Sequence, residues 1–387
     1  MTTHLLNTYA QAPEVFVGGD GAELRTQDGR VYLDFLAGIA VSALGHNHPR
    51  LVTELQDQLT RSIHLSNLYR HPFAEDVATR IARLTGLEAV FFTNSGTEAN
   101  ECAIKIARKH HYKRGEPRPG LVALEGSFHG RSMGSVSLTH TEKYRKPFAP
   151  LLPNVEFVAP GDTARLEALL STRTFGALFV EPIQGEQGVK ELPHAFLRAA
   201  RELCTRTGTL LVHDEVQAGC GRTGTFLSAD AAGVKPDVAT LAKPIAAGLP
   251  MGCAVVSEEL ADVFEPGDHG STFAGGPLVC RGALVFLELM EEGGLQEAVR
   301  ARGAELRSGL ADLQGEFPVI TELRGRGLMQ GVRFARGAEE LQKKLYAKGL
   351  ITNRTAGDVL RILPPYVVTS EQIARGVSIL REALAEL

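Results

Sequence analysis

Short apolar runs recur through the middle of the chain, and stretches with helical spacing separate most of them. Apolar runs of this length predict strands that are buried on both faces, as in a parallel sheet. Their alternation with helical segments such as 98–112 and 193–207 predicts an α/β fold with a large, doubly wound and mostly parallel sheet. The predicted strands are residues 89–93, 121–125, 155–158, 177–181, 209–214, 237–241 and 253–256.

The two ends of the chain show different patterns. Residues 22–26 and 30–35 flank an Asp-Gly pair, which predicts a hairpin with a tight turn. A long helical stretch follows residue 275, and after it come shorter apolar runs and a final helix at 370–387. This pattern indicates a smaller α+β domain. The expected division is residues 1–60 in the small domain, residues 61–275 as the large domain, and residues 276–387 completing the small domain.

Composition narrows the possible classes of function. The 387 residues are 44% hydrophobic and 22% charged, and a net charge of −4 leaves no basic surplus for nucleic-acid binding. No apolar stretch reaches the roughly 18 residues that predict a membrane span, and residues 1–12 lack a signal peptide's apolar core. The five cysteines form no Cys-x-x-Cys pair, which argues against a disulfide framework or a metal site. We therefore expect a cytoplasmic protein without nucleic-acid or membrane partners.

Two of the predicted strands lead into residues that can do chemistry. Asp214 ends the run at 209–214, and Lys243 follows the run at 237–241. In open α/β sheets, ligands bind outside the carboxyl ends of the strands. A pyridoxal phosphate enzyme needs such a pair, because a lysine holds the cofactor as a Schiff base and an acid keeps the pyridine nitrogen protonated. Taken singly, an Asp after a strand is more often a helix cap, and a Lys there is usually solvated.

A candidate phosphate site lies between the first of these strands and the helix that follows it. Ser95 has capping-box spacing to a glutamate three residues later, so a helix is expected to begin there. Gly96 lets a ligand approach the backbone, and Thr97 adds a hydroxyl beside the free N–H groups of the helix start. A capped helix without a ligand explains this segment equally well. The Gly-rich loop at 270–276 offers the hydroxyl groups of Ser271 and Thr272.

Other side chains suit contacts with a planar ring or a carboxylate. Phe128 follows a predicted strand and can stack on a ring, and Arg131 has the geometry to bind a carboxylate. Glu186 lies in a Gly-rich loop after another strand. Arg361 lies within an apolar run, where a charge usually needs a buried partner or a ligand. Each signal is weak alone, but together they converge on one edge of the predicted sheet.

These pieces together resemble the class III, or ornithine-type, aminotransferases of fold type I. The resemblance implies a pyridoxal 5'-phosphate cofactor, small-molecule substrates, and a homodimer whose subunits share their active sites. It extends over nearly the whole chain and is carried by the segments 34–41, 94–100, 128–131, 214–217, 241–243 and 361–365.

The resemblance implies a role for each matching residue around the cofactor. Lys243 would hold the cofactor and move the proton during the transfer, and Asp214 would pair with the pyridine nitrogen. Gln217 would bond the phenolic oxygen of the ring, while Val216 and Phe128 would enclose the ring. The implied cofactor-binding set is Ser95, Gly96, Thr97, Phe128, Asp214, Glu215, Val216, Gln217, Lys243 and, from the other subunit, Thr272.

The same resemblance implies the substrate contacts. Arg131 would bind the α-carboxylate of N2-acetylornithine, with Ser271 close to this substrate. Arg361 would bind the α-carboxylate of glutamate or 2-oxoglutarate, and Glu186 would neutralise Arg361 when the donor lacks a carboxylate at that end. The implied reaction moves the terminal amino group of N2-acetyl-L-ornithine to 2-oxoglutarate, giving N-acetyl-L-glutamate 5-semialdehyde and L-glutamate.

The choice of amine donor stays open. A tyrosine usually occupies the position of Ile39 in ornithine aminotransferases, and the apolar Ile39 suits an acylated nitrogen better than a charged amine. Ornithine, 4-aminobutyrate, N-succinyl-diaminopimelate and carrier-linked lysine are alternatives, as are a 2-oxoglutarate-independent aminomutase and a cofactor-binding protein without catalysis. The departures from the family pattern that bear on substrate preference are Gln187, Pro244, Ala274 and Gly276.

Overall fold

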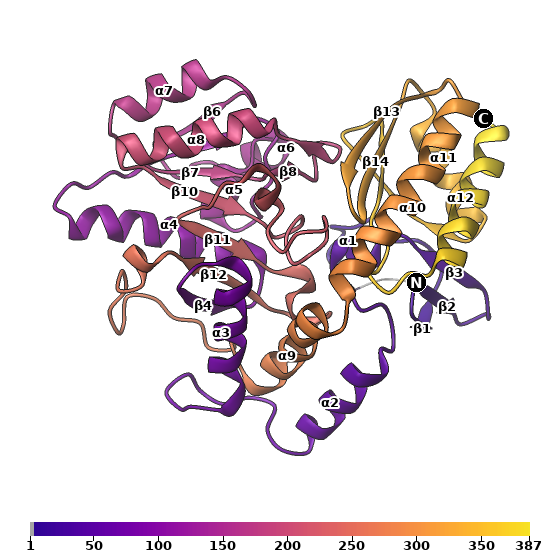
Figure 1. Cartoon of the computed structure of the whole chain (residues 1–387), viewed down its shortest axis with the longest axis horizontal. Helices are drawn as coiled ribbons and strands as arrows, with labels where there is room; N and C mark the ends of the chain where they lie inside the picture. Colours follow the sequence, from indigo (N-terminus) through magenta and orange to yellow (C-terminus); the bar gives the residue numbers. More distant parts are fainter. Residues whose placement is uncertain (1–3) are drawn as a thin grey trace.

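A seven-stranded sheet forms the centre of the large part of the molecule in the computed structural model, which describes residues 4–387 (Figure 1). Its strands correspond to the runs that the sequence predicts, with ends that differ by no more than two residues. Their bounds are β4 Ala89–Thr93, β5 Gly120–Leu124, β6 Val155–Val158, β7 Phe175–Val180, β10 Leu210–Asp214, β11 Val238–Leu241 and β12 Gly252–Val256.

The order of these strands is β4–β12–β11–β10–β7–β5–β6. Pairing is parallel from β6 through β5, β7 and β10 to β11. Only β12 within this sheet runs the other way, antiparallel to both β11 and β4. The expected doubly wound, mostly parallel sheet is therefore confirmed.

Helices cover both faces of this sheet. Ala177 and Phe179 pack against α4 (Gly96–Lys113), whereas their neighbours Leu178 and Val180 pack against α7 and α8 on the other face. Successive side chains of a strand point to opposite faces, so a sheet covered on both sides needs apolar residues at every position. This two-sided burial explains the uninterrupted apolar runs in the sequence. The bounds of α7 and α8 are Thr163–Ser171 and His194–Thr207.

Two four-stranded sheets lie beside the large sheet, to its right in Figure 1. The first has the order β1–β2–β3–β15, with bounds Phe16–Asp20, Glu23–Thr26, Val31–Asp34 and Leu350–Ile351. The second has the order β13–β14–β17–β16, with bounds Ile320–Arg326, Met329–Phe334, Val359–Ile362 and Asn353–Thr355. Strands β2 and β3 form the predicted hairpin. Strand β15 pairs with β3, which joins the two ends of the chain and supports the expected division, whose boundaries stay a prediction.

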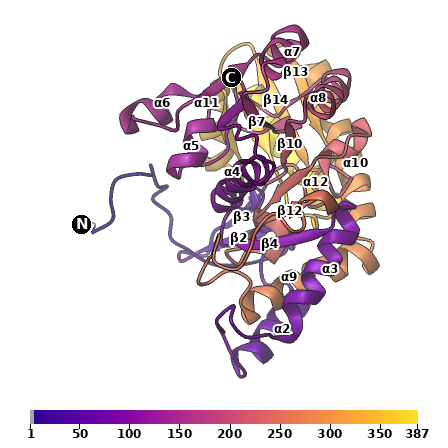
Figure 2. The same ribbon diagram turned by 90° about the vertical axis from the view of Figure 1, so that its left-hand side faces the viewer.

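The helical stretch after residue 275 differs from the expectation. It consists of two helices, α9 (Pro277–Glu292) and α10 (Leu295–Glu316), because Gly294 between them has a φ of 64°, which favours glycine. Residues 4–15 carry no regular element, and the beginning of this segment extends away from the body (Figure 2), whereas Glu14 and Val15 accept hydrogen bonds from Tyr346 and Gln27. The remaining helices are α1 Ala37–Ala40, α2 Pro49–Leu59, α3 Pro72–Thr85, α5 Met133–Leu138, α6 Glu142–Arg145, α11 Ala338–Ala347 and α12 Ser370–Ala385. The remaining short elements are strands β8 Ile183–Gln184 and β9 Lys190–Glu191, and 3-10 helices η1 Lys146–Phe148, η2 Ser228–Ala232, η3 Lys243–Ala246 and η4 Glu258–Leu260.

Residues 4–387 contain no disulfide, no candidate metal cluster and no candidate membrane span. All five cysteines are buried and unbridged. Within the described part of the chain, no His, Cys, Asp and Glu side chains gather in threes as a metal site would need. None of the described helices combines the length and the apolar character that a membrane crossing requires.

Two glycines of α10 provide a matched test of how this helix packs. A Cβ at Gly303 would lie 2.6 Å from the backbone of Gly327, whereas a Cβ at Gly315 would have no neighbour within 4 Å. Gly303→Ala should therefore lower the free energy of unfolding by about 1–3 kcal/mol through overpacking. Gly315→Ala should raise it by up to about 1 kcal/mol, because the unfolded chain loses freedom. Urea unfolding measures both; shifts of the same sign would contradict the close contact.

Candidate functional site

A cavity of about 380 Å³ lies at the carboxyl ends of β10 and β11. Its walls come from the loops that follow β4, β5, β10 and β11, which is the usual ligand position in an α/β sheet. The predicted site residues that line this cavity are Ser95, Gly96, Thr97, Phe128, Arg131, Asp214, Val216, Gln217 and Lys243.

The carboxylate of Asp214, at the end of β10, is anchored by three hydrogen bonds. Its Oδ2 accepts from His129 Nδ1 at 2.8 Å and from Asn100 Nδ2 at 2.8 Å, and its Oδ1 accepts from the Val216 N–H at 3.0 Å. The Thr240 hydroxyl, on the neighbouring strand β11, donates to Asn100 Oδ1 at 2.9 Å. Asp214 is only 5% exposed, so this network fixes one orientation of a negative charge at the cavity wall.

Lys243 begins the short 3-10 helix η3 directly after β11. Its φ of 49° is unusual for a residue with a side chain, and such strained positions are held in place by the packing around them. Burial lowers the pKa of its amine, while the Asp214 carboxylate opposes that shift and Arg361 adds to it. A lowered pKa favours the neutral amine, which is the form that reacts with a carbonyl carbon.

The start of α4 forms the opposite end of the cavity. Ser95 caps the helix by accepting from the Glu98 N–H at 3.3 Å, and Glu98 Oε2 accepts from the Asn94 N–H at 2.6 Å. The predicted capping box is therefore present, with the glutamate reaching one residue further back. Among the described residues, the N–H groups of Gly96 and Thr97 have no hydrogen-bond partner. Free N–H groups at a helix start suit an anion.

Two close backbone contacts shape this loop. A Cβ at Gly96 would lie 2.6 Å from Val216 Cγ1, so these two residues can pack against each other only because Gly96 has no side chain. Gly252, at the start of β12, lies under the loop, since a Cβ there would be 2.5 Å from the Ser95 carbonyl oxygen. The Thr97 hydroxyl accepts from the N–H groups of Arg131 and Ser132, both at 3.2 Å. Thr97 therefore ties the Arg131 loop to the helix start.

Aromatic rings surround the arginine at the mouth of the cavity. The guanidinium of Arg131 lies 3.5 Å from the centre of the Tyr144 ring and 5.4 Å from that of Phe128. The Phe128 N–H donates to Glu181 Oε1 at 2.8 Å, which fixes the backbone beneath the ring. Burial, and then the nearby Asp214 carboxylate, raise the pKa of Glu181 well above its usual range. Arg131 itself is exposed and holds its charge beside the opening.

An ion pair between buried Arg361 and half-buried Glu186 lies between the cavity wall and the second small sheet, although neither residue lines the cavity itself. Arg361 on β17 is 1% exposed, and its Nη1 donates to Glu186 Oε1 at 2.6 Å and to Gln217 Oε1 at 3.0 Å. Its Nε donates to Asn353 Oδ1 at 3.1 Å. The partner that sequence reasoning required for a charge in an apolar strand is therefore Glu186. Gln217 lines the cavity and contacts Arg361, so its amide N–H₂ is the part that stays free for a ligand.

Glu215 does not reach the cavity. It follows Asp214, and its side chain turns to the opposite side, where Oε1 accepts from the Ala229 N–H at 3.0 Å. It is fully buried, and burial raises the pKa of its carboxyl to about 7. Any cofactor contact of Glu215 would therefore use its backbone, whereas the side chain supports the η2 segment.

Ser271 and Thr272 lie outside this cavity within the single chain. Both line a second cavity of about 680 Å³, which residues 66–68 also line. Ser271 Oγ accepts from Asn94 Nδ2 at 2.9 Å, and Asn94 lines the Lys243 cavity. Ser271 is thus linked to the site indirectly, while Thr272 lies beyond its walls.

Ile39 lies in a strained turn and is half exposed. Residues 37–40 all have positive φ, with 66° at Ile39, a conformation that β-branched side chains rarely adopt. Val41, two residues later, lines the cavity. The four departures from the family pattern occupy varied environments: Pro244 is the buried second residue of η3, Ala274 is buried, Gly276 caps α9, and Gln187 is exposed beside Gly126.

Sequence reasoning missed the partners that hold the site together. Asn100 and Glu181 follow or precede recognised motif residues, but nothing in their local sequence indicated contact with Asp214 or Phe128. Tyr144 lies on a short helix and Asn353 on a three-residue strand, and neither segment has a periodic pattern. Only the three-dimensional structure brings these four side chains to the site.

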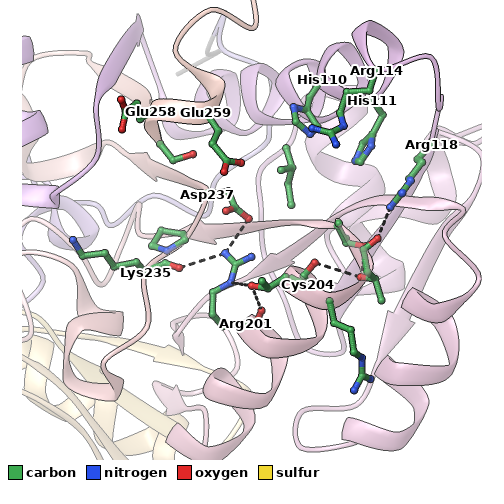
Figure 3. A pocket seen from close by; sticks show the side chains of 18 of the residues that line it. His110, His111, Arg114, Arg118, Arg201, Cys204, Lys235, Asp237, Glu258 and Glu259 are labelled. Atoms are coloured by element: carbon green, nitrogen blue, oxygen red, sulfur yellow. Dashed lines mark hydrogen bonds and ion pairs between the residues drawn. The ribbon is translucent and has the colours of Figure 1, made fainter.

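A larger cavity of about 890 Å³ lies at the opposite, amino edge of the large sheet (Figure 3). Its charged groups are largely exposed, and Arg201 pairs with Asp237 at 2.9 Å across its floor. It contains none of the predicted site residues. Size alone therefore does not identify the functional site, whereas strand polarity does.

A family profile described as aminotransferase class III matches residues 7–384. The chain belongs to the class III aminotransferases. It is accordingly a transaminase, and its cofactor is pyridoxal phosphate, as the sequence predicted. One family structure, ornithine aminotransferase from Toxoplasma gondii, has been crystallised with partial occupancy of this cofactor at its active site.

Relatives within this family match the chain from end to end. Acetylornithine aminotransferase of Rhodobacter capsulatus is 43% identical, with 100% of this chain and 99% of the relative covered. That of Aquifex aeolicus is 42% identical, with 99% and 100% covered. The T. gondii ornithine aminotransferase superposes with a TM-score of 0.94 at 34% identity, covering 99% of this chain and 93% of its own. Acetylornithine aminotransferase of Elizabethkingia anophelis gives 0.88 at 30% identity, covering 99% and 97%.

The side chains of this class III aminotransferase fit its cofactor. Lys243 offers an amine with a lowered pKa, and the anchored Asp214 offers a carboxylate. The start of α4 offers unpaired N–H groups for a phosphate. Gly96 and Val216 both line the cavity and pack directly against each other, so the helix start and the Val216 side chain form one continuous wall for a ligand.

The raised pKa of the buried Glu215 carboxyl can be tested by the pH dependence of the free energy of unfolding. The unfolded group loses its proton near pH 4.5, but the folded group keeps it until about pH 7, so wild-type stability falls across that window. Glu215→Gln removes this loss, so its free energy of unfolding relative to wild type should rise by about 3 kcal/mol between pH 4.5 and 8. Urea unfolding of the cofactor-saturated enzyme at several pH values measures it. The exposed Glu202→Gln is the control, and parallel pH profiles for both variants would refute the shift.

Proposed function

We propose that the chain transfers the terminal amino group of N2-acetyl-L-ornithine to 2-oxoglutarate, giving N-acetyl-L-glutamate 5-semialdehyde and L-glutamate, a step of arginine biosynthesis. Relatives at 40–43% identity over nearly the whole chain bear the name acetylornithine aminotransferase, which supports this substrate. The ion pair between Arg361 and Glu186 is the observation that carries the proposal.

That ion pair suits an enzyme that must accept two different substrates in turn. One substrate presents a terminal amine without a nearby carboxylate, and the other presents an α-amino or α-keto acid. When Glu186 pairs with Arg361, no buried charge is left alone for the first substrate. The second substrate brings its own carboxylate, which can replace Glu186 because that side chain is half-buried and lies on a loop. Arg361 is held by Asn353 and Gln217 meanwhile.

The residues around the cofactor would each have a separate role. Bound pyridoxal phosphate supplies an electron-withdrawing ring and a carbonyl carbon for the amine. Lys243 would hold that carbon and carry the proton to and from the substrate carbon that bears nitrogen, as its lowered pKa permits. Asp214 would face the ring nitrogen, and Phe128 and Val216 would enclose the ring. Gly96 and Thr97 would give N–H groups to the phosphate, with Ser95 beside them.

The donor contacts follow from charge and apolarity. Arg131, steadied by Tyr144, would bind the α-carboxylate of the acylated donor. Ile39 is apolar and offers no hydrogen bond, which suits an acylated nitrogen better than a free amine. Ser271, bonded to Asn94 near the cavity, would lie near the same substrate.

We further propose a cytoplasmic homodimer in which Thr272 completes the phosphate site of the other subunit. Leu68, Tyr69 and Phe273 are 87%, 69% and 68% exposed, an unusual display of large apolar side chains. They lie in two segments joined by the bond from Asn67 Nδ2 to the Ser271 carbonyl. A partner covering this patch would account for the exposure and bring Thr272 close to a second cavity.

The amine donor is tested by single turnover without an acceptor. The cofactor-loaded enzyme is mixed separately with N2-acetylornithine, ornithine, 4-aminobutyrate and an N-acyl-lysine, and the absorbance of the bound cofactor is followed. Acetylornithine should react at least about tenfold faster than ornithine, since a charged amine beside Ile39 stays unpaired. A faster reaction with another amine would replace the proposed substrate but keep the transaminase chemistry. Repeated turnover without 2-oxoglutarate would instead support an aminomutase, because a transaminase without an acceptor stops after one equivalent of product per site.

The lysine assignment is tested by Lys243→Ala against the matched control Lys235→Ala. Lys235 is exposed in the cavity at the opposite edge of the sheet. Removing Lys243 should lower turnover at least about 10³-fold, because the proton carrier is lost. Lys235→Ala should keep wild-type turnover. Steady-state rates with a saturating donor measure both, and an active Lys243→Ala enzyme would rule out the assignment.

A further inference from the structure

Arg222 is a fully buried arginine that the proposed reaction does not use. It lies in the loop after β10, five residues beyond Gln217, and is 0% exposed. Its guanidinium lies 4.4 Å from the centre of the Tyr366 ring. Burial lowers the pKa of the guanidinium, and Tyr366 and the Asp34 carboxylate oppose that shift only in part.

Arg222 is buried without an ion pair. Among residues 4–387, no carboxylate lies within ion-pair distance of it, and its Nε and Nη2 atoms have no hydrogen-bond partner. Burying a charge in this way costs free energy, and an apolar side chain of similar volume would avoid that cost. The bonds that Arg222 does make therefore indicate why a guanidinium is there.

Those bonds run to the second small sheet. Arg222 Nη1 donates to the Leu328 carbonyl at 3.1 Å and to the Pro364 carbonyl, while the Arg222 carbonyl accepts from the Leu328 N–H at 3.0 Å. Leu328 precedes β14, and Pro364 follows β17. Arg222 Nη1 thus holds the backbone at the facing ends of β14 and β17, and we call these two hydrogen bonds the Arg222 clasp.

The strand register connects this clasp to the carboxylate-binding arginine. In the antiparallel pair of β14 and β17, Gln330 lies opposite Ile362 and Gly331 lies opposite Arg361. Leu328 and Pro364 are therefore the next facing positions beyond this ladder, three residues from Arg361. At the other end of the same loop, Gln217 receives a hydrogen bond from Arg361 Nη1.

We propose that Arg222 is a positioning residue for Arg361. It locks the end of the β14–β17 ladder onto the loop after β10, so that Arg361 meets Glu186, Gln217 and the substrate carboxylate in one geometry. This inference rests on the proposed role of Arg361 in binding 2-oxoglutarate. The amine donor binds through Arg131, on a loop that Arg222 does not touch, so the two substrates respond differently to loss of the clasp.

The test is Arg222→Met, which keeps the apolar volume and removes the clasp. The KM for 2-oxoglutarate and the calorimetric Kd for glutarate, an unreactive dicarboxylate, should rise about tenfold, as expected when one hydrogen bond to a charged group is misaligned. The KM for the amine donor should change by less than about twofold. Arg222→Lys retains the charge and one bond, so it should fall between wild type and Met.

Arg307→Met is the matched control. Arg307 on α10 also donates to backbone carbonyls, at Leu323, Arg324 and Gly325 on β13, and to Gln330 Oε1 on β14. None of these partners lies on the loop after β10, so Arg307 does not join that loop to the β14–β17 ladder. Its loss should lower the melting temperature without the selective rise in the KM for 2-oxoglutarate. Equal selectivity in both variants would reduce Arg222 to a structural residue and overturn the inference.

The outcomes also separate this inference from the proposed function. If the wild-type enzyme does not use 2-oxoglutarate, the proposed function fails, whatever the variants do. If the wild type does use it and Arg222→Met raises both KM values equally, or neither, only the positioning role fails. If Arg222→Met does not fold, Arg222→Lys carries the test, and an unchanged Kd for glutarate in that variant would contradict the proposal.

Discussion

The carboxylate of Asp214 receives hydrogen bonds from separate segments, and the geometry of the site depends on that convergence. Asn100 comes from α4, whose first turn is the candidate phosphate site, and His129 comes from the loop that carries Phe128 and Arg131. Thr240 fixes Asn100 from β11, which leads into Lys243. The network around Asp214 therefore aligns the two ends of the cavity and its ring-facing wall, because none of these segments can shift without breaking a bond to Asp214 or to Asn100.

Much of the fold was predictable because a strand that is buried on both faces is apolar at nearly every position. The strands of the large sheet appear in the sequence as unbroken apolar runs, and the Asp-Gly pair indicates the hairpin turn. The short strands β8, β9 and β15 were not predictable, since two residues hold no period and pairing depends on distant partners. The break between α9 and α10 was missed although Gly293 and Gly294 mark it, because apolar spacing continues on both sides.

Some residues of the candidate site were likewise predictable from the sequence, and others were not. Residues at strand ends and at the helix start were predictable, since sheet polarity determines where they meet. Their supporting partners were not, because the contact of Asn353 with Arg361 joins two strands of one sheet, and that of Tyr144 with Arg131 joins a loop to a short helix. The direction of the Glu215 side chain could have been predicted from the sequence. It follows Asp214, and consecutive residues in extended chain point to opposite sides.

The close approach of Gly252 to Ser95 has a consequence for how the enzyme would lose its cofactor. Lys243 and Gly252 are joined by a single short segment, so the proposed covalent anchor and the support beneath the candidate phosphate loop belong to one piece of chain. Local opening of that segment would free both ends of the cofactor in a single event rather than one after the other. Residues 243–252 and the first turn of α4 would then exchange their amide hydrogens as one cooperative unit, slowed together by the bound cofactor.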